Sequence, residues 1–144
     1  MTSEERVKYE VENVLPRFFK VRYYPGCDPR LMVKIDISNC FAGVYYWINF
    51  YKMSVFPRRQ PVVTAGKMLY DCDGRAMNSP SSRQHLLGTY NGETWMCLFH
   101  DSDWMPNGSL YMLILKARGW LIAYHNHMKF GEPLETWLPA NRVR

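Results

Sequence analysis

The chain has 144 residues, of which 47% are apolar and 22% are charged, and its formal net charge is +5. This length predicts one domain, residues 1–144, that can fold without a metal or a disulfide. The composition excludes a disordered chain. The longest uncharged apolar run, residues 41–51, is too short to span a membrane, and no basic-then-apolar leader opens the sequence. We therefore expect a cytoplasmic protein with no membrane partner.

Positive charge is concentrated in the middle of the sequence. Residues 1–16 carry four Glu against Arg6 and Lys8. Residues 17–83 carry eleven Lys or Arg against four Asp, an excess of seven, and residues 84–144 carry five charges of each sign. An anionic partner would be drawn to the middle segment.

The first expected element is a helix over residues 3–15. Thr2 and Glu5 have the spacing of a capping box, and Pro16 ends the pattern. One apolar face is predicted, formed by Val7, Val11, Val14 and Leu15.

Seven or eight strand-like segments follow, rich in aromatic and β-branched residues. Turn residues separate them at 25–29, at Asn91-Gly92 and at Arg118-Gly119, and the polar stretch 73–82 predicts a long surface loop. A final helical turn is expected over 132–138. The predicted strands are 18–24, 31–37, 44–56, 62–70, 85–90, 94–100, 109–117 and 120–127.

These elements predict an α+β domain. The helix over 3–15 is expected to pack on a strongly curved, mostly antiparallel sheet of about seven strands, either open or partly closed into a barrel. The short connections favour an antiparallel meander. The β-rich region would run over 17–127, and 128–144 would be a tail or a short helix.

Basic and aromatic side chains alternate through the middle segment. Alternate residues of a strand share a face, so Tyr45, Trp47 and Tyr51 should face one way and Val44, Tyr46, Ile48 and Phe50 the other, toward the core. Arg and Lys can follow a phosphate backbone while aromatic rings stack on bases. The two arginines between Pro57 and Pro61 should lie on a stiff exposed loop. The predicted nucleic-acid-binding residues are Arg17, Arg22, Lys52, Arg58, Arg59, Lys67, Tyr45 and Trp47.

Three histidines raise the question of a metal site. His125 and His127 would share a face of the predicted strand 120–127, and His100 ends the predicted strand 94–100. Three imidazoles and a water could hold a catalytic zinc ion. The pair alone is also typical of half-exposed histidines beside a hairpin, and no cofactor or metal ligand is predicted.

A helix from Cys40 onward is the alternative to the strand predicted over 44–56. A cysteine at the start of such a helix would have a lowered pKa, which would make Cys40 a candidate nucleophile. Asn39-Cys40-Phe41, Trp95–Leu98 and Gly119-Trp120 resemble short patches of picornavirus leader proteases of papain type. In that family a histidine opens the penultimate core strand, whereas this chain has Ser109 or Leu110 there. The resemblance therefore lacks its catalytic base.

The function predicted from these patterns is a non-catalytic binding module whose basic, aromatic-rich segment engages RNA or another polyanion. Three alternatives stay open: a module that binds a protein partner through exposed aromatic and Met side chains, a curved sheet that encloses a small apolar ligand, and a papain-like cysteine protease that uses Cys40.

Overall fold

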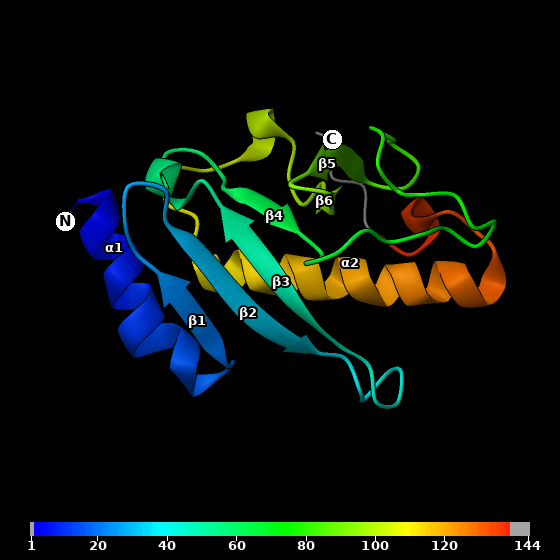
Figure 1. Ribbon diagram of the computed structural model, residues 1–144, viewed down its shortest axis with the longest axis horizontal. Coiled ribbons are helices and arrows are strands. Elements are labelled where there is room, and N and C mark those ends of the chain that lie inside the picture. Colours follow the sequence, from blue (N-terminus) through cyan, green and yellow to red (C-terminus); the bar gives the residue numbers. More distant parts are fainter. Residues whose placement is uncertain (1, 139–144) are drawn as a thin grey trace.

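A six-stranded antiparallel sheet and two main helices form residues 2–138, the part of the chain that the computed structural model describes (Figure 1). The helices are α1, Ser3–Tyr9, and α2, Leu110–Phe130. The strands are β1, Val21–Tyr24; β2, Arg30–Asp36; β3, Tyr45–Tyr51; β4, Val62–Thr64; β5, Leu86–Tyr90; and β6, Glu93–Met96. Their order across the sheet is β1-β2-β3-β4-β6-β5.

The N-terminal helix starts where the sequence predicts. The Thr2 hydroxyl accepts a hydrogen bond from the Glu5 backbone N–H at 3.1 Å, and the Thr2 backbone N–H donates to the Glu5 carboxylate at 2.8 Å. The helix continues as a π-helical turn over Glu10–Val14 and a 3-10 turn over Leu15–Arg17. The predicted apolar face is buried at Val7, Val11 and Leu15 and half-buried at Val14.

The strand pattern of the first half is confirmed, with shorter strands. Leu31, Val33 and Ile35 of β2 and Ile48 and Phe50 of β3 are all fully buried. The Asn91-Gly92 turn joins β5 to β6 with φ of 53° and 74°, both in the left-handed region that this hairpin turn requires. At Gly66, just after β4, a Cβ would lie only 2.1 Å from the Trp47 carbonyl oxygen. This close backbone approach marks where the chain leaves the strand predicted over 62–70.

The prediction of strands over 109–117 and 120–127 is wrong, because these residues form α2. The Ser109 hydroxyl accepts a hydrogen bond from the Met112 backbone N–H at 3.0 Å, and Gly131 ends the helix with a φ of 82°. Arg118-Gly119 lies inside the helix and is not a turn. The buried residues recur at helical spacing: Leu110, Leu113, Ile114, Ala117, Trp120, Leu121 and Tyr124.

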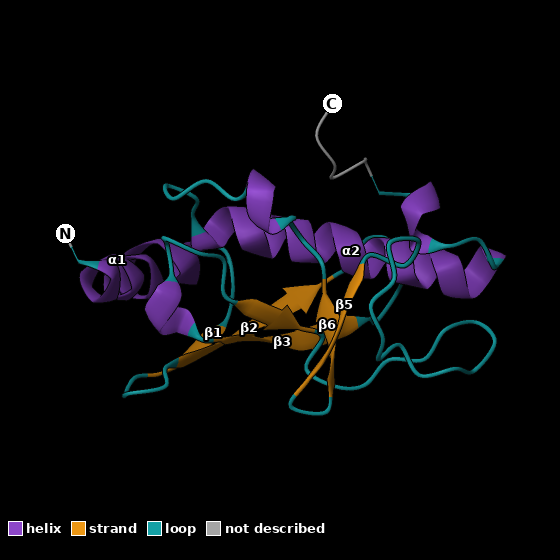
Figure 2. Ribbon diagram, turned by 90° about the horizontal axis from the view of Figure 1, so that it is seen from above, coloured by secondary structure: helices purple, strands orange, loops and turns teal. Residues whose placement is uncertain are grey.

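The prediction of a partly closed or strongly curved sheet is also wrong. With 110–127 in a helix, the sheet has six strands, and β1 and β5 remain as edges that do not pair with each other. Figure 2 shows the helices on one side of the sheet, with α2 running along it. A single core fills the space between them. The β-rich region therefore ends at β6 and not at 127.

The C-terminal part differs in the same way. Residues 128–130 complete α2, and the helical turn predicted over 132–138 is a 3-10 turn at Leu134–Thr136. Residues 139–144 of the predicted tail lie outside the described residues. Within 2–138, no helix combines the length and the apolar character needed to cross a membrane.

Candidate nucleic-acid interface

One side of the sheet carries no helix of the described chain. We call this side, facing away from α2, the open face (Figure 2). The predicted alternation in β3 is confirmed: Tyr46, Ile48 and Phe50 are buried on the covered side, whereas Tyr45 is 53% exposed and Trp47 is half-buried. Tyr51 lies on the same side as Tyr45 and Trp47, as predicted. The rings of Tyr45 and Trp47 are therefore at the surface of the sheet, whereas those of Tyr46 and Phe50 belong to the core.

Three aromatic rings at the β1–β3 end of the open face are each paired with a cation. The guanidinium carbon of Arg22 lies 4.8 Å from the centre of the Trp47 ring, and Lys34 Nζ lies 4.4 Å from the centre of the Tyr45 ring. A third pair joins Arg30 to Tyr24 at 4.7 Å. Such cation–π contacts hold a positive charge over one face of each ring. Of the predicted site, Arg22, Tyr45 and Trp47 are thus brought together.

Three further predicted residues lie elsewhere, and Lys52, expected inside the strand 44–56, lies beyond the end of β3. Lys52 follows β3 with a φ of 56°, at the opposite end of that strand from Tyr45. Arg58 and Arg59 are exposed, as predicted. Two hydrogen bonds hold their loop. The indole N–H of Trp104 donates to the Pro57 carbonyl at 2.8 Å, and the Arg59 backbone N–H donates to the Val55 carbonyl at 3.1 Å. We call Lys52, Arg58 and Arg59, which all follow the end of β3 in the chain, the loop-end cations.

Two further predicted residues join neither group. Arg17 is exposed on the last helical turn before β1. Lys67 Nζ lies 5.1 Å from the ring centre of Tyr46, a residue of the covered side of β3. The eight predicted residues therefore fall into several places and do not form one patch.

A basic cleft that sequence reasoning missed adjoins the Lys34–Tyr45 pair. It has a volume of about 250 Å³ and brings Lys20 and Lys34 together with Arg118 of α2, against the one carboxylate of its lining, Asp36. The Arg118 guanidinium donates to the Asn39 side-chain oxygen at 2.8 Å. No signal in the sequence places Arg118 here as long as 118–119 are read as a hairpin turn, because the cleft depends on α2 passing behind β2.

A polar network supports the other end of the open face. The Glu93 carboxylate of β6 accepts hydrogen bonds from Asn49 Nδ2 at 3.0 Å, from the Tyr51 hydroxyl at 2.7 Å and from the Thr64 hydroxyl at 2.5 Å. Burial and the neighbouring Glu93 carboxylate raise the pKa of Tyr51. The network ties β6 to β3 and β4, so we assign it a structural role.

The three histidines do not converge. In a helix, residues two apart point to different sides, so His125 and His127 no longer share a face. His125 Nε2 lies 2.6 Å from the Tyr46 hydroxyl, whereas His127 Nε2 accepts from the Cys72 backbone N–H at 3.0 Å. Among residues 2–138, no group of His, Cys, Asp or Glu side chains is arranged to hold a metal ion.

Cys40 does not start a helix. It lies in a turn between β2 and β3, where its backbone N–H donates to the Ile37 carbonyl at 2.9 Å. The thiol is exposed. The helix dipole on which its predicted reactivity depended is therefore missing.

Comparisons with protein-family models, with curated proteins and with solved structures found no match for this chain.

Proposed function

We propose that the open face binds single-stranded RNA. The observation that carries this proposal is the row of cation–aromatic pairs, Arg22 on Trp47 and Lys34 on Tyr45, on a side of the sheet that neither α1 nor α2 covers. Bases of any sequence can stack on exposed aromatic rings, and the adjoining cations contact phosphates. The cleft formed by Lys20, Lys34 and Arg118 extends the positive charge beyond the rings.

The binding experiment compares two sets of charges in the same protein. Affinity for a fluorescent single-stranded RNA is measured by anisotropy at several salt concentrations, for the wild type, for Arg22→Gln with Lys34→Gln, and for Arg58→Gln with Arg59→Gln. Removing one phosphate-binding cation should reduce the slope of log affinity against log salt by roughly 0.7. We expect the open-face variant to bind RNA more weakly and with a smaller slope.

The loop-end variant separates the two places that the sequence prediction combined. Both of its arginines are exposed, so the loop-end variant should remain folded, and circular dichroism checks the open-face variant, in which Lys34 is half-buried. If only the loop-end variant loses affinity, the site is at that loop and not on the open face. Salt-insensitive binding, or no binding by the wild type, would overturn the proposal. Equal affinity for heparin would mean that charge alone, without stacking, explains the binding.

A protein partner is the second candidate function, and an exposed aromatic side chain at the edge of the basic cleft favours it. Phe18 is 58% exposed, and its ring centre lies 5.0 Å from that of Tyr111 at the N-terminal end of α2. Exposed aromatic clusters are typical of interaction hot spots. A complex that survives high salt and is abolished by Phe18→Ala, but not by the open-face substitutions, would favour this function over RNA binding.

A further inference from the structure

The basic cleft connects the open face with the layer that contains α2. Lys34 belongs to both places, since it lines the cleft and forms the cation–π pair with Tyr45. Lys20, which also lines the cleft, directly precedes β1, and Arg118 is on α2. Three cations from separate parts of the chain therefore meet beside the row of aromatic rings.

The cleft lies at a corner of the sheet. The first residue of β1, Val21, pairs with Val33, and β1 is an edge strand. No strand of residues 2–138 therefore lies beside Ile35 and Asp36, the last residues of β2, on the side away from β3. An RNA strand that runs over the open face would leave the sheet at this corner. The cleft is thus in a position to hold the end of such a strand.

Positive charge exceeds negative charge in this cleft. The Asp36 carboxylate accepts hydrogen bonds from the Ser38 hydroxyl and from the Ser38 backbone N–H, the latter at 2.8 Å, and these bonds lower its pKa. In the described part of the chain, none of the three cations forms an ion pair with a carboxylate. Three positive charges against one negative charge leave the lining with a net charge of +2.

Arg118 retains hydrogen-bond donors for a ligand. Its guanidinium group has five N–H donors in a plane, a geometry that can hold a phosphate by two parallel hydrogen bonds. Within residues 2–138, the hydrogen bond that Arg118 donates from its side chain goes to Asn39. Phe19 and Ile35 add apolar surface to the cleft, which strengthens ionic contacts by excluding water.

We infer that the cleft binds a terminal phosphate of the RNA strand, so that the protein prefers a phosphorylated RNA end to an internal stretch of RNA. The inference rests on the proposed function, because it concerns the end of the strand that the open face would bind. A terminal phosphate monoester carries roughly 1.5–2 negative charges at neutral pH, whereas an internal phosphate carries one. The net charge of +2 therefore matches the terminal group better.

The test compares three forms of one single-stranded RNA: with a 5′-phosphate, with a 3′-phosphate, and with hydroxyl groups at both ends. Affinity for the full-length protein is measured by anisotropy of an internal fluorescent label at one salt concentration. We expect a terminal phosphate to increase the affinity at least about tenfold, the gain expected of one additional charge-assisted contact. A gain from either end supports the inference, and comparison of the two forms shows which end enters the cleft.

Substitutions in the cleft should change this preference in opposite directions. Arg118→Gln should remove most of it and change the binding of unphosphorylated RNA less, because Arg118 belongs to none of the cation–π pairs of the open face. Asp36→Asn removes the negative charge but keeps the oxygen that accepts from Ser38, so it should increase the preference. Exposed Lys20 provides a second variant, Lys20→Gln, in case Arg118→Gln does not fold.

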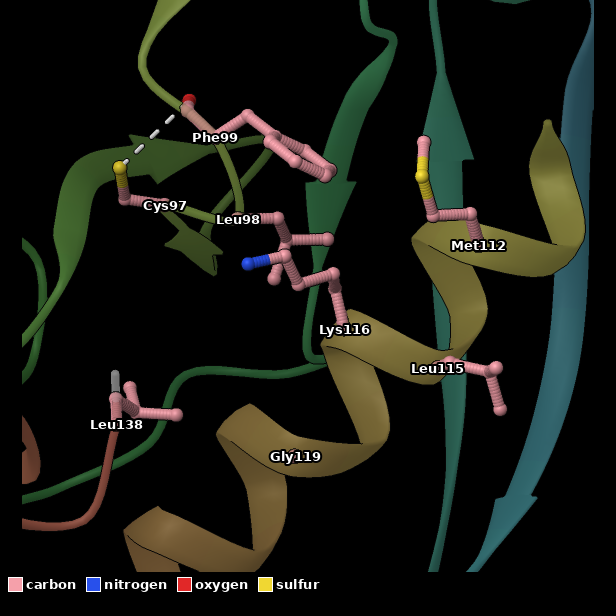
Figure 3. A pocket seen from close by; sticks show the side chains of 8 residues that line it. All are labelled: Cys97, Leu98, Phe99, Met112, Leu115, Lys116, Gly119 and Leu138. Atoms are coloured by element: carbon pink, nitrogen blue, oxygen red, sulfur yellow. Dashed lines mark hydrogen bonds between the residues drawn. The ribbon is translucent and has the colours of Figure 1, made fainter. Parts of the chain in front are cut away.

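The matched control is Lys116→Gln, two positions from Arg118 in the same helix. Lys116 lines an apolar groove between α2 and the segment 97–99, and this groove shares no residue with the cleft (Figure 3). The control removes the same charge from the same helix, so it should leave the preference for a terminal phosphate unchanged. Loss of the preference in both variants would mean that overall charge explains it, which would overturn the inference.

A change of pH tests the phosphate itself. The preference should decrease as the pH falls below about 6, because a phosphate monoester then gains its second proton. The charged side chains of the cleft keep their charges in this range, since Lys and Arg stay protonated and the lowered pKa of Asp36 keeps its carboxylate ionised. A preference that does not change with pH would contradict the recognition of a phosphate dianion.

The remaining outcomes separate this inference from the proposed function. Equal affinity for phosphorylated and unphosphorylated RNA would overturn the inference and leave the proposed function standing. Failure of every form of the RNA to bind would overturn both. A phosphoserine peptide that binds as tightly as the phosphorylated RNA would show that the cleft recognises a phosphate monoester on a protein, and it would overturn the assignment to RNA.

Discussion

The two sides of the sheet use the same strands for different purposes. On the covered side, Ile35, Ile48 and Phe50 are fully buried against α2 and the rest of the core. The residues that precede two of them, Lys34 and Trp47, lie on the open face. Each forms a cation–π pair there, Lys34 with Tyr45 and Trp47 with Arg22. Because alternate residues serve opposite sides, neighbouring positions in one strand should separate folding from binding.

The largest effect should come from the covered side of β3. Ile48→Ala removes a fully buried side chain and should lower the free energy of unfolding by about 2–5 kcal/mol. The neighbouring Trp47→Ala, on the open face, should destabilise the protein less, since Trp47 is only half-buried and packs against Arg22 at the surface. Denaturant titration measures both. Equal destabilisation by the two substitutions would show that the open face also carries folding energy.

The alternation behind this contrast could be predicted from the sequence. Leu31, Val33 and Ile35 alternate with Met32, Lys34 and Asp36, and a period of two places the two sets on opposite sides of the sheet. The same rule correctly placed Tyr45 and Trp47 on one side. The cations that pair with those rings could not be predicted from the sequence, because the pairing of β1, β2 and β3 determines that Arg22 lies near Trp47.

The segment that forms α2 shows why the second half of the fold was predicted wrongly. Its helical spacing is visible in Leu110, Leu113, Ile114 and Ala117, but its aromatic and β-branched content favours strands, and Arg118-Gly119 resembles a turn. Burial decided the competition, since the apolar side of a 21-residue helix covers the sheet. The basic cleft includes Arg118 of that helix, so the cleft could not be predicted while the segment was read as two strands.

The second largest decrease in stability is expected from breaking the hydrogen bonds of Glu93, which tests whether the open face contributes to folding. Glu93→Ala leaves the Tyr51 and Thr64 hydroxyls and the Asn49 amide without their shared acceptor. Unpaired polar groups cost about 1–3 kcal/mol, so we expect a decrease in stability of that size in denaturant titration. Glu93→Gln keeps one carbonyl acceptor and should be less destabilising. Equal stability of both variants and the wild type would mean that the network adds nothing.

A smaller effect, of opposite sign, is expected at Gly119 on the layer that covers the sheet. Gly119→Ala should stabilise the protein by about 0.5–1 kcal/mol, because the helix gains a better residue and the added methyl group meets open space. Gly66→Ala is the matched control, since there a Cβ would collide with the Trp47 carbonyl. The thermal unfolding temperature should rise for the first and fall for the second. Destabilisation by Gly119→Ala would show that the space beside Gly119 is smaller than the structure indicates.

The smallest effect is a pH dependence where the covered side meets α2. Burial, and then the positive charge of Lys67, lower the pKa of His125 from its usual 6.5. The Tyr46 hydroxyl, whose own pKa burial raises to about 12, keeps its proton and is hydrogen-bonded to the neutral imidazole at 2.6 Å.

Because the unfolded chain binds this proton more readily, the contribution of His125 to stability is complete above pH 6.5. It should disappear as the pH falls from there through the lower folded pKa. Titration of the His125 ring protons by NMR measures that pKa directly. Lys67→Met should raise it part of the way toward 6.5, since burial, the larger cause, remains. A His125 pKa at or above 6.5 in the wild type would mean that the imidazole is better solvated than its contacts with Tyr46 and Phe41 allow.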